Sequence, residues 1–129
     1  MPVLTKAPTL GDLLKFELSA SYCRETVTLK AGTSYPLGAV LGRITASGKY
    51  RLSPAVAVVG DEGAETAIAV LLEAIDATAA DKTGLIAARG PVILSKAALV
   101  FDASVDQAAE KTAKHTQLAS LGLVARETA

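Results

Sequence analysis

The chain has 129 residues and a mass of 13.2 kDa, which is the size of one domain. Half of its residues are hydrophobic and 13 basic residues balance 13 acidic ones, so the composition excludes global disorder and a basic surface for nucleic acid or membranes. One cysteine, Cys23, and one histidine, His115, exclude an intrachain disulfide and the common metal sites built from these residues.

The sequence predicts neither a membrane-spanning segment nor an export signal. Its longest uninterrupted apolar run, Ala67–Leu72, is too short to cross a bilayer. Prolines and charges interrupt residues 1–16, unlike the apolar core of a signal peptide. We therefore expect a protein made in the cytoplasm.

Residues 1–23 differ from the rest of the chain in their proline and glycine punctuation. Leu14, Phe16 and Leu18 alternate with charged residues, which is the pattern of a strand, whereas Leu10, Leu13 and Leu14 fit one helical turn equally well. Two interpretations remain open: an extended N-terminal arm outside the core, or an edge strand of the domain itself.

From Arg24 onward the pattern changes to short strands separated by turns. Alternation and β-branched residues predict strands, and glycine or proline between them predicts the turns. Pro91 cannot donate to a ladder, so strand pairing must break or lie at an edge there. The predicted strands cover residues 25–29, 39–45, 50–52, 66–75, 85–88, 92–94 and 123–127.

A helix is predicted in the C-terminal half. Ser104 and Gln107 match a capping box at its start, and Gly122 is a suitable residue just after its end. Glu110 and Lys114 form a favourable pair four residues apart. The predicted inward face is narrow and rich in small residues: Val105, Ala108, Ala109, Thr112 and Ala119. The fold class is therefore α+β, a β-rich small single domain with one helix in its C-terminal half and an extended N-terminal arm.

We find no pattern that predicts catalysis, a cofactor site or a metal site. His115 is interpreted as an exposed residue of the predicted helix, and Cys23 as a bystander thiol because no base is evident beside it. Asp61, Glu62 and Glu65 flank glycines without the spacing of a calcium loop, so we interpret them as a solvated turn.

A predicted hairpin turn that carries Lys49 leaves one alternative function open, that of a carrier domain with a covalently modified lysine. Biotinyl and lipoyl carrier domains place a modified lysine at such a tip, although Lys49 lacks the flanking methionines of the first and the preceding acid of the second. The small side chains of the core bury little area each, which leaves room for oligomerisation to contribute to stability.

The order of elements resembles the bacteriophage head decoration protein family, the class of the lambda-like capsid-stabilising protein D. No single motif carries this resemblance, which covers about residues 11–126. The matching segments are Gly11–Glu17, Arg24–Thr28, Ala31–Tyr50, the acidic glycine loop and apolar run of Asp61–Asp76, Phe101–Asp102 before the helix, and Leu118–Arg126.

The resemblance implies a virion protein that binds as a homotrimer to the outer surface of the expanded head, at three-fold and quasi-three-fold positions, and contacts the major capsid protein. Residues 24–129 would be the decoration and trimerisation domain, and residues 1–23 the capsid-binding arm. We expect that deletion of residues 1–18 leaves the domain folded and trimeric. Another oligomeric structural module remains the alternative to decoration. The candidate contact residues of the arm are Leu10, Leu13, Leu14, Phe16, Leu18 and Tyr22.

Overall fold

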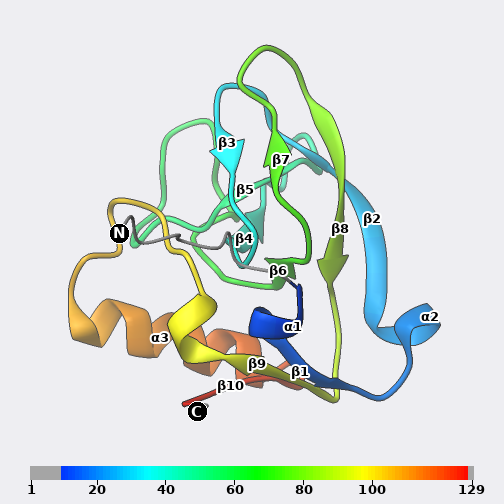
Figure 1. Cartoon of the computed structure of the whole chain (residues 1–129). Coiled ribbons are helices and arrows are strands. Elements are labelled where there is room, and N and C mark those ends of the chain that lie inside the picture. The colour runs from blue at the N-terminus through cyan, green and yellow to red at the C-terminus, as the bar shows by residue number, and fades with distance from the viewer. Residues whose placement is uncertain (1–9, 128–129) are drawn as a thin grey trace, which may run out of the picture.

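Five strands close into a barrel that forms the upper part of the molecule in Figure 1. The computed structural model describes residues 10–127, so the first nine residues of the predicted arm lie outside the described part. In spatial order the barrel strands are β2 (Arg24–Leu29), β5 (Tyr50–Leu52), β4 (Val40–Arg43), β6 (Ala69–Leu71) and β8 (Lys82–Ala87).

The longest pairing in the barrel joins β2 to β8. The two strands run antiparallel from the pair Arg24–Ala87 to the pair Leu29–Lys82. The β-branched residues that predicted β2 suit this pleated surface, and Leu29 at its end is fully buried. The barrel encloses an aliphatic core whose fully buried large members include Leu29, Leu41, Leu71 and Ile86.

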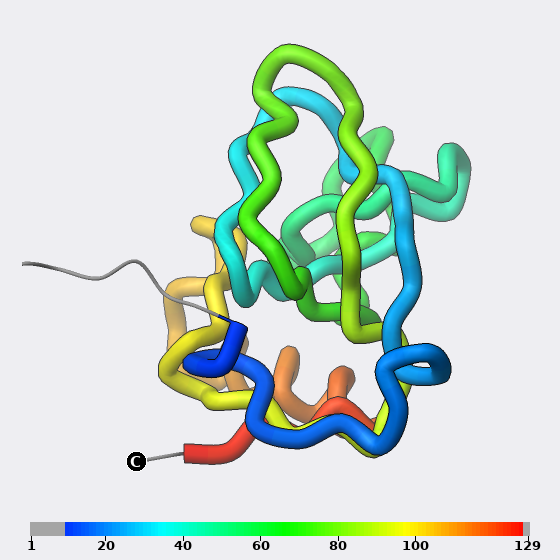
Figure 2. The backbone as a smooth tube through the Cα atoms, turned by 45° about the vertical axis from the view of Figure 1, so that its right-hand side comes forward, coloured from blue at the N-terminus to red at the C-terminus, as the bar shows by residue number. Residues whose placement is uncertain are grey.

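A second, three-stranded sheet lies below the barrel. Its order is β1 (Leu14–Glu17), β9 (Val92–Ser95) and β10 (Leu123–Arg126), with β1 antiparallel and β10 parallel to β9. The three strands run side by side along the bottom of Figure 2, in blue, yellow and red. The inner face of this sheet contributes Val92, Leu94 and Leu123 to a second apolar cluster.

Short elements complete the fold. One-turn helices α1 and α2 precede β1 and β2, and β3 pairs with β7 in a two-stranded ribbon. The segment 66–75, predicted as one strand, is therefore divided: the chain bends after β6, and the end of the segment belongs to β7, which pairs with β3. These elements are α1 (Leu10–Leu13), α2 (Ala20–Cys23), β3 (Ser34–Tyr35), β7 (Ile75–Asp76) and the 3₁₀ turn η1 (Lys96–Ala98).

The predicted helix exists, but it begins later than expected. Helix α3 spans Ala108–Ala119, with Gln107 as its N-cap and the Glu110 carboxylate accepting from the Gln107 N–H at 3.1 Å. Ser104 does not cap it, because its hydroxyl instead donates to the Asp102 carboxylate at 2.6 Å. Gly122 adopts the predicted left-handed conformation, with φ of +81°.

The inward face of α3 also differs from the prediction. The alanines expected to face the core are exposed, and the buried residues of the helix are Lys114 and Leu118. Leu118 packs in the same apolar cluster as the three-stranded sheet. The α+β, β-rich class with one longer C-terminal-half helix is confirmed. Of the five residues predicted to face inward, Val105 is buried just before the helix, and the prediction is wrong for the other four, which are exposed.

Candidate functional site

The outer face of the three-stranded sheet presents an apolar row to solvent. Phe16 in β1 pairs with Ile93 in β9, and Ile93 pairs with Val124 in β10. Paired residues of neighbouring strands point to the same side of a sheet. Phe16 is 48% and Val124 36% exposed, and Ile93 between them is half-buried. We call these three residues the outer sheet face.

A β-bulge explains why Phe16 points outward. Leu14 pairs with Leu94, but Phe16 pairs with Ile93, so Lys15 is an extra residue in β1. In a regular strand, Leu14 and Phe16 would share one face; the extra residue separates them. Leu14 is half-buried and packs against the apolar cluster, whereas Phe16 faces solvent.

The structure divides the predicted arm residues into two groups. Leu13 is fully buried, and Leu10 and Leu14 pack against the same cluster. Phe16, Leu18 and Tyr22 are exposed. Residues 10–17 therefore belong to the domain as a short helix and an edge strand, which is the second of the two interpretations left open, and any free arm ends before Leu10.

Two polar contacts fix β1 and the turn that follows it. The Arg24 guanidinium donates to both oxygens of Glu17, at 3.0 and 2.6 Å, and these hydrogen bonds raise the pKa of Arg24. The Leu18 N–H donates to the Pro91 carbonyl at 3.1 Å. The guanidinium of Arg89 lies 5.4 Å from the centre of the Tyr22 ring, which orients that exposed tyrosine.

Sequence reasoning missed Ile93 and Val124. Both could have been found from the alternation of inward and outward side chains along a strand, since each directly follows a buried residue in a short apolar strand. That β1, β9 and β10 lie side by side could not be read from the sequence, because residues 14, 93 and 124 are far apart in the chain.

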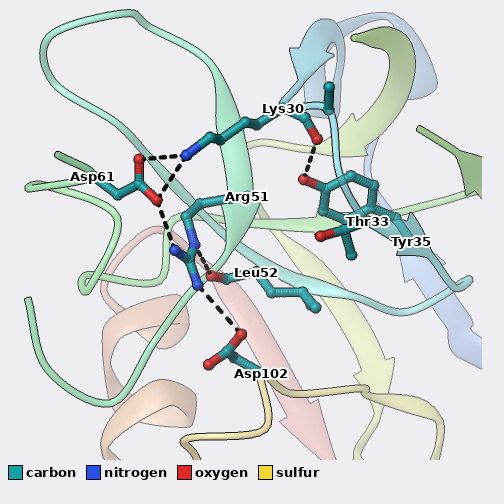
Figure 3. A pocket seen from close by; sticks show the side chains of 8 residues that line it. Lys30, Thr33, Tyr35, Arg51, Leu52, Asp61 and Asp102 are labelled. Atoms are coloured by element: carbon teal, nitrogen blue, oxygen red, sulfur yellow. Dashed lines mark hydrogen bonds and ion pairs between the residues drawn. The ribbon is translucent and has the colours of Figure 1, made fainter. Parts of the chain in front are cut away.

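A cluster of charged side chains connects the barrel to the segment before α3 (Figure 3). The Asp61 carboxylate accepts from the Lys30 ammonium at 2.8 Å and from the Arg51 guanidinium at 2.7 Å. Arg51 also reaches Asp102 at 3.3 Å. Asp61 is only 7% exposed, so the prediction of a solvated turn is wrong for this residue.

Hydrogen bonding explains the electrostatics of that cluster. The hydrogen bond from Lys30, followed by that from Arg51, holds the pKa of Asp61 below its usual value despite the opposing effect of burial. Tyr35 donates from its hydroxyl to the Lys30 carbonyl at 2.7 Å beside a small cavity of about 130 Å³. Each charge here has an opposite partner, so the cluster serves to hold segments together.

The other residues considered for chemistry occupy structural positions. Cys23 is fully buried, and Lys49 forms an ion pair with Asp81 at 2.6 Å. His115 is half-buried with its ring 5.7 Å from that of Phe101, so the prediction of an exposed histidine is wrong. Burial, with a smaller effect of the Lys96 charge, lowers the pKa of His115.

The described part of the chain offers neither a cluster of metal ligands nor a membrane-spanning helix. Within residues 10–127, no group of three or more His, Cys, Asp or Glu side chains is arranged to hold a metal ion. Of the helices described there, none combines the length and the apolar character that a bilayer crossing requires.

Comparison with known proteins identifies the class. A family model described as bacteriophage lambda head decoration protein D matches residues 3–123, nearly the whole chain. Comparison with curated proteins gave no significant match. The match places the chain among the structural proteins that decorate the capsid surface of phage virions. It belongs to the family of the bacteriophage lambda head decoration protein D.

Proposed function

We propose that this protein binds as a homotrimer to the outer surface of the expanded phage head, at three-fold and quasi-three-fold positions, where it contacts the major capsid protein. Bound there, it stabilises the head against the pressure of packaged DNA. The observation that carries the proposal is the outer sheet face, an exposed apolar row on a sheet whose inner face is fully packed. Exposed contiguous apolar residues of this kind mark interaction sites.

The sheet also offers backbone groups to a partner strand. Among the described strands, β1 and β10 each have one neighbour, so each leaves one edge open. An extended capsid segment that adds to such an edge gains main-chain hydrogen bonds, and apolar side chains beside it give specificity. Phe16 on β1 and Val124 on β10 lie next to these two edges.

The strength of a single contact is modest. An aromatic side chain buries about 150–250 Å², so covering the half of Phe16 that is exposed removes roughly 100 Å² from water, worth about 2–3 kcal/mol. A trimer presents three such faces at once. Linked contacts of this kind raise affinity by about 10²–10⁴ when the spacing of the sites matches that of the faces.

The test is cosedimentation of the purified protein with expanded heads. Phe16→Ala is expected to weaken binding at least about tenfold, which corresponds to about 1.4 kcal/mol, while the unfolding temperature of the free protein changes little. Thr26→Ala, an exposed residue of the barrel strand β2, is the matched control and should bind as the parent does. Normal binding by Phe16→Ala would contradict the proposed surface.

The second measurement is the mass in solution. Light scattering is expected to give about three times the 13.2 kDa of one chain. Removal of residues 1–9 tests the contribution of a free arm, and the cut must stop before Leu10 because the truncation to residue 18 would take a buried leucine and a whole edge strand from the domain.

A further inference from the structure

A loop between β5 and β6 exposes three valines, although its ends are firmly held. Val56 is 70%, Val58 37% and Val59 96% exposed. We call residues 55–60 the valine loop. Single exposed apolar residues are common on protein surfaces, but three within four positions form a patch that loses water contact only when a partner covers it.

The start of the valine loop is fixed by a buried lysine. The Lys114 ammonium, on helix α3, donates to the Ser53 hydroxyl at 2.9 Å and to the carbonyls of Pro54 and Glu65 at 2.7 and 2.5 Å. Its three protons are therefore all used. The Ala55 N–H, the first of the loop, donates to the Ser104 hydroxyl at 2.9 Å.

The end of the loop is fixed as well. Asp61 is held by Lys30 and Arg51, and its N–H donates to the Val58 carbonyl at 2.9 Å. Gly63, with φ of +101°, lies so close to Thr45 that a side chain would collide with it. The valines are thus presented on a pre-ordered loop, which reduces the entropy lost when a partner covers them.

A groove with complementary character lies beside the same helix. Its volume is about 560 Å³; of its lining residues Leu99 is buried and Phe101 half-buried, while Ala97, Lys96 and Lys111 are exposed. The Lys111 ammonium lies 5.9 Å from the centre of the Phe101 ring. His115 and Glu127 complete the lining. We call this the Phe101 groove.

We propose that the valine loop of one copy of this chain inserts into the Phe101 groove of the next copy around the trimer axis. This inference rests on the proposed homotrimer. A three-fold ring needs a heterologous contact, in which one patch of each subunit meets a different patch of its neighbour. The exposed valine loop and the Phe101 groove, with its apolar lining residues Leu99 and Phe101, are two such patches: the loop would insert and the groove would accept it.

Charge supports a second copy as the occupant. Glu62 is exposed directly after the loop, and its carboxylate accepts from the Gly60 N–H at 3.1 Å, so the acid stays beside Val59. Lys96 and Lys111 outnumber Glu127, the one acid of the groove lining, so the groove supplies the opposite charge. Docking of the valines thus brings Glu62 toward these two lysines, and such complementarity favours the correct partner.

Two variants and their mixture test the contact. Val59→Glu puts a charge on the loop, and Ala97→Trp fills the groove; each residue is exposed, so neither change disturbs the core. Each variant alone is expected to be monomeric by light scattering, with an association constant reduced at least about 100-fold. Mixed, they should form one-to-one heterodimers and no trimer, because an intact loop meets an intact groove only once.

A crosslink provides an independent readout. Oxidation of the double variant Val59→Cys, Ala97→Cys should give covalent trimers. The matched control carries Val59→Cys with Ala80→Cys, an exposed residue of the loop between β7 and β8, and should give none. The native Cys23 is fully buried and does not compete.

The outcomes separate this inference from the proposed function. If both single variants stay trimeric, or if their mixture gives no heterodimer, the contact is wrong while capsid decoration by a trimer stands. If the parent protein is monomeric yet binds expanded heads, both the contact and the homotrimer are wrong. Failure of the parent to bind heads, with the crosslinked trimer present, overturns the proposed binding to the expanded head and leaves the contact standing.

Discussion

Leu13 gives a direct test of where the domain begins. Its side chain is fully buried in the cluster that contains Val92, Leu94 and Leu123. Replacing a buried leucine by alanine removes its transfer free energy and leaves a cavity, at a cost of about 2.7–5 kcal/mol in well-packed cores. For a domain of this size, with an unfolding entropy of roughly 2.1 cal/mol/K per residue, a loss of about 3 kcal/mol lowers Tm by roughly 10–15 °C.

The assay is thermal and urea unfolding of Leu13→Ala beside Phe16→Ala, both at one protein concentration because association contributes to apparent stability. Phe16 lies three residues away but is 48% exposed, so its loss should cost less than about 1 kcal/mol. A Leu13→Ala variant that melts with the parent would refute the assignment of residues 10–17 to the domain. It would restore the alternative in which this segment is a free arm.

Two further predictions concern buried charges. Asp61→Asn should destabilise the protein by about 1–3 kcal/mol at pH 7, since it removes the carboxylate that Lys30 and Arg51 share and leaves Arg51 with Asp102 alone. The pKa of Asp61 is lowered in the folded protein, so its contribution to stability is present above the ordinary value of 3.8 and is lost as pH falls through the lower folded value. Unfolding measured at decreasing pH should therefore show the difference in unfolding free energy between parent and variant shrinking in that range. Lys114→Met should cost about 1–3 kcal/mol, because the carbonyls of Pro54 and Glu65 lose their donor. Burial lowers the pKa of Lys114, so as pH rises the folded protein loses this proton before the unfolded chain does. The free energy of unfolding of the parent therefore increases as pH rises toward 10.5. Urea unfolding at increasing pH should show this increase in the parent and not in Lys114→Met.

Strands with local signals were predictable from the sequence. β2, β5 and β9 appear within one or two residues of their predicted bounds, because alternation and turn residues report directly on a half-buried strand. The break before β9 follows from Pro91, which has no N–H to donate. Which strands become neighbours was not predictable, since β9 pairs with β1 from the start of the chain and with β10 from its end.

Side-chain burial on α3 was the least predictable feature. A lysine on a polar, alanine-rich helix is normally expected to be exposed to solvent. Lys114 is buried because its ammonium donates to the carbonyls of Pro54 and Glu65, which are far from it in the chain. The helix start was misjudged for a similar reason. The capping box was predicted with Ser104 as the N-cap and Gln107 as its partner, but the Ser104 hydroxyl donates to Asp102, and Gln107 is itself the N-cap with Glu110 as its partner.

The edge strand changes the energetics proposed for capsid binding. Residues 10–17 already hold helix and strand conformation in the unbound chain, so binding through Phe16 avoids an ordering cost of about 8–16 kcal/mol for eight residues. Affinity for the three-fold site then depends on the spacing of three outer sheet faces, which the contact between valine loop and Phe101 groove would set. A monomeric Val59→Glu variant keeps its own sheet face intact and should still bind expanded heads, but about 10²–10⁴-fold more weakly than the trimer. Equal binding by monomer and trimer, measured by cosedimentation at matched subunit concentration, would show that simultaneous attachment contributes nothing.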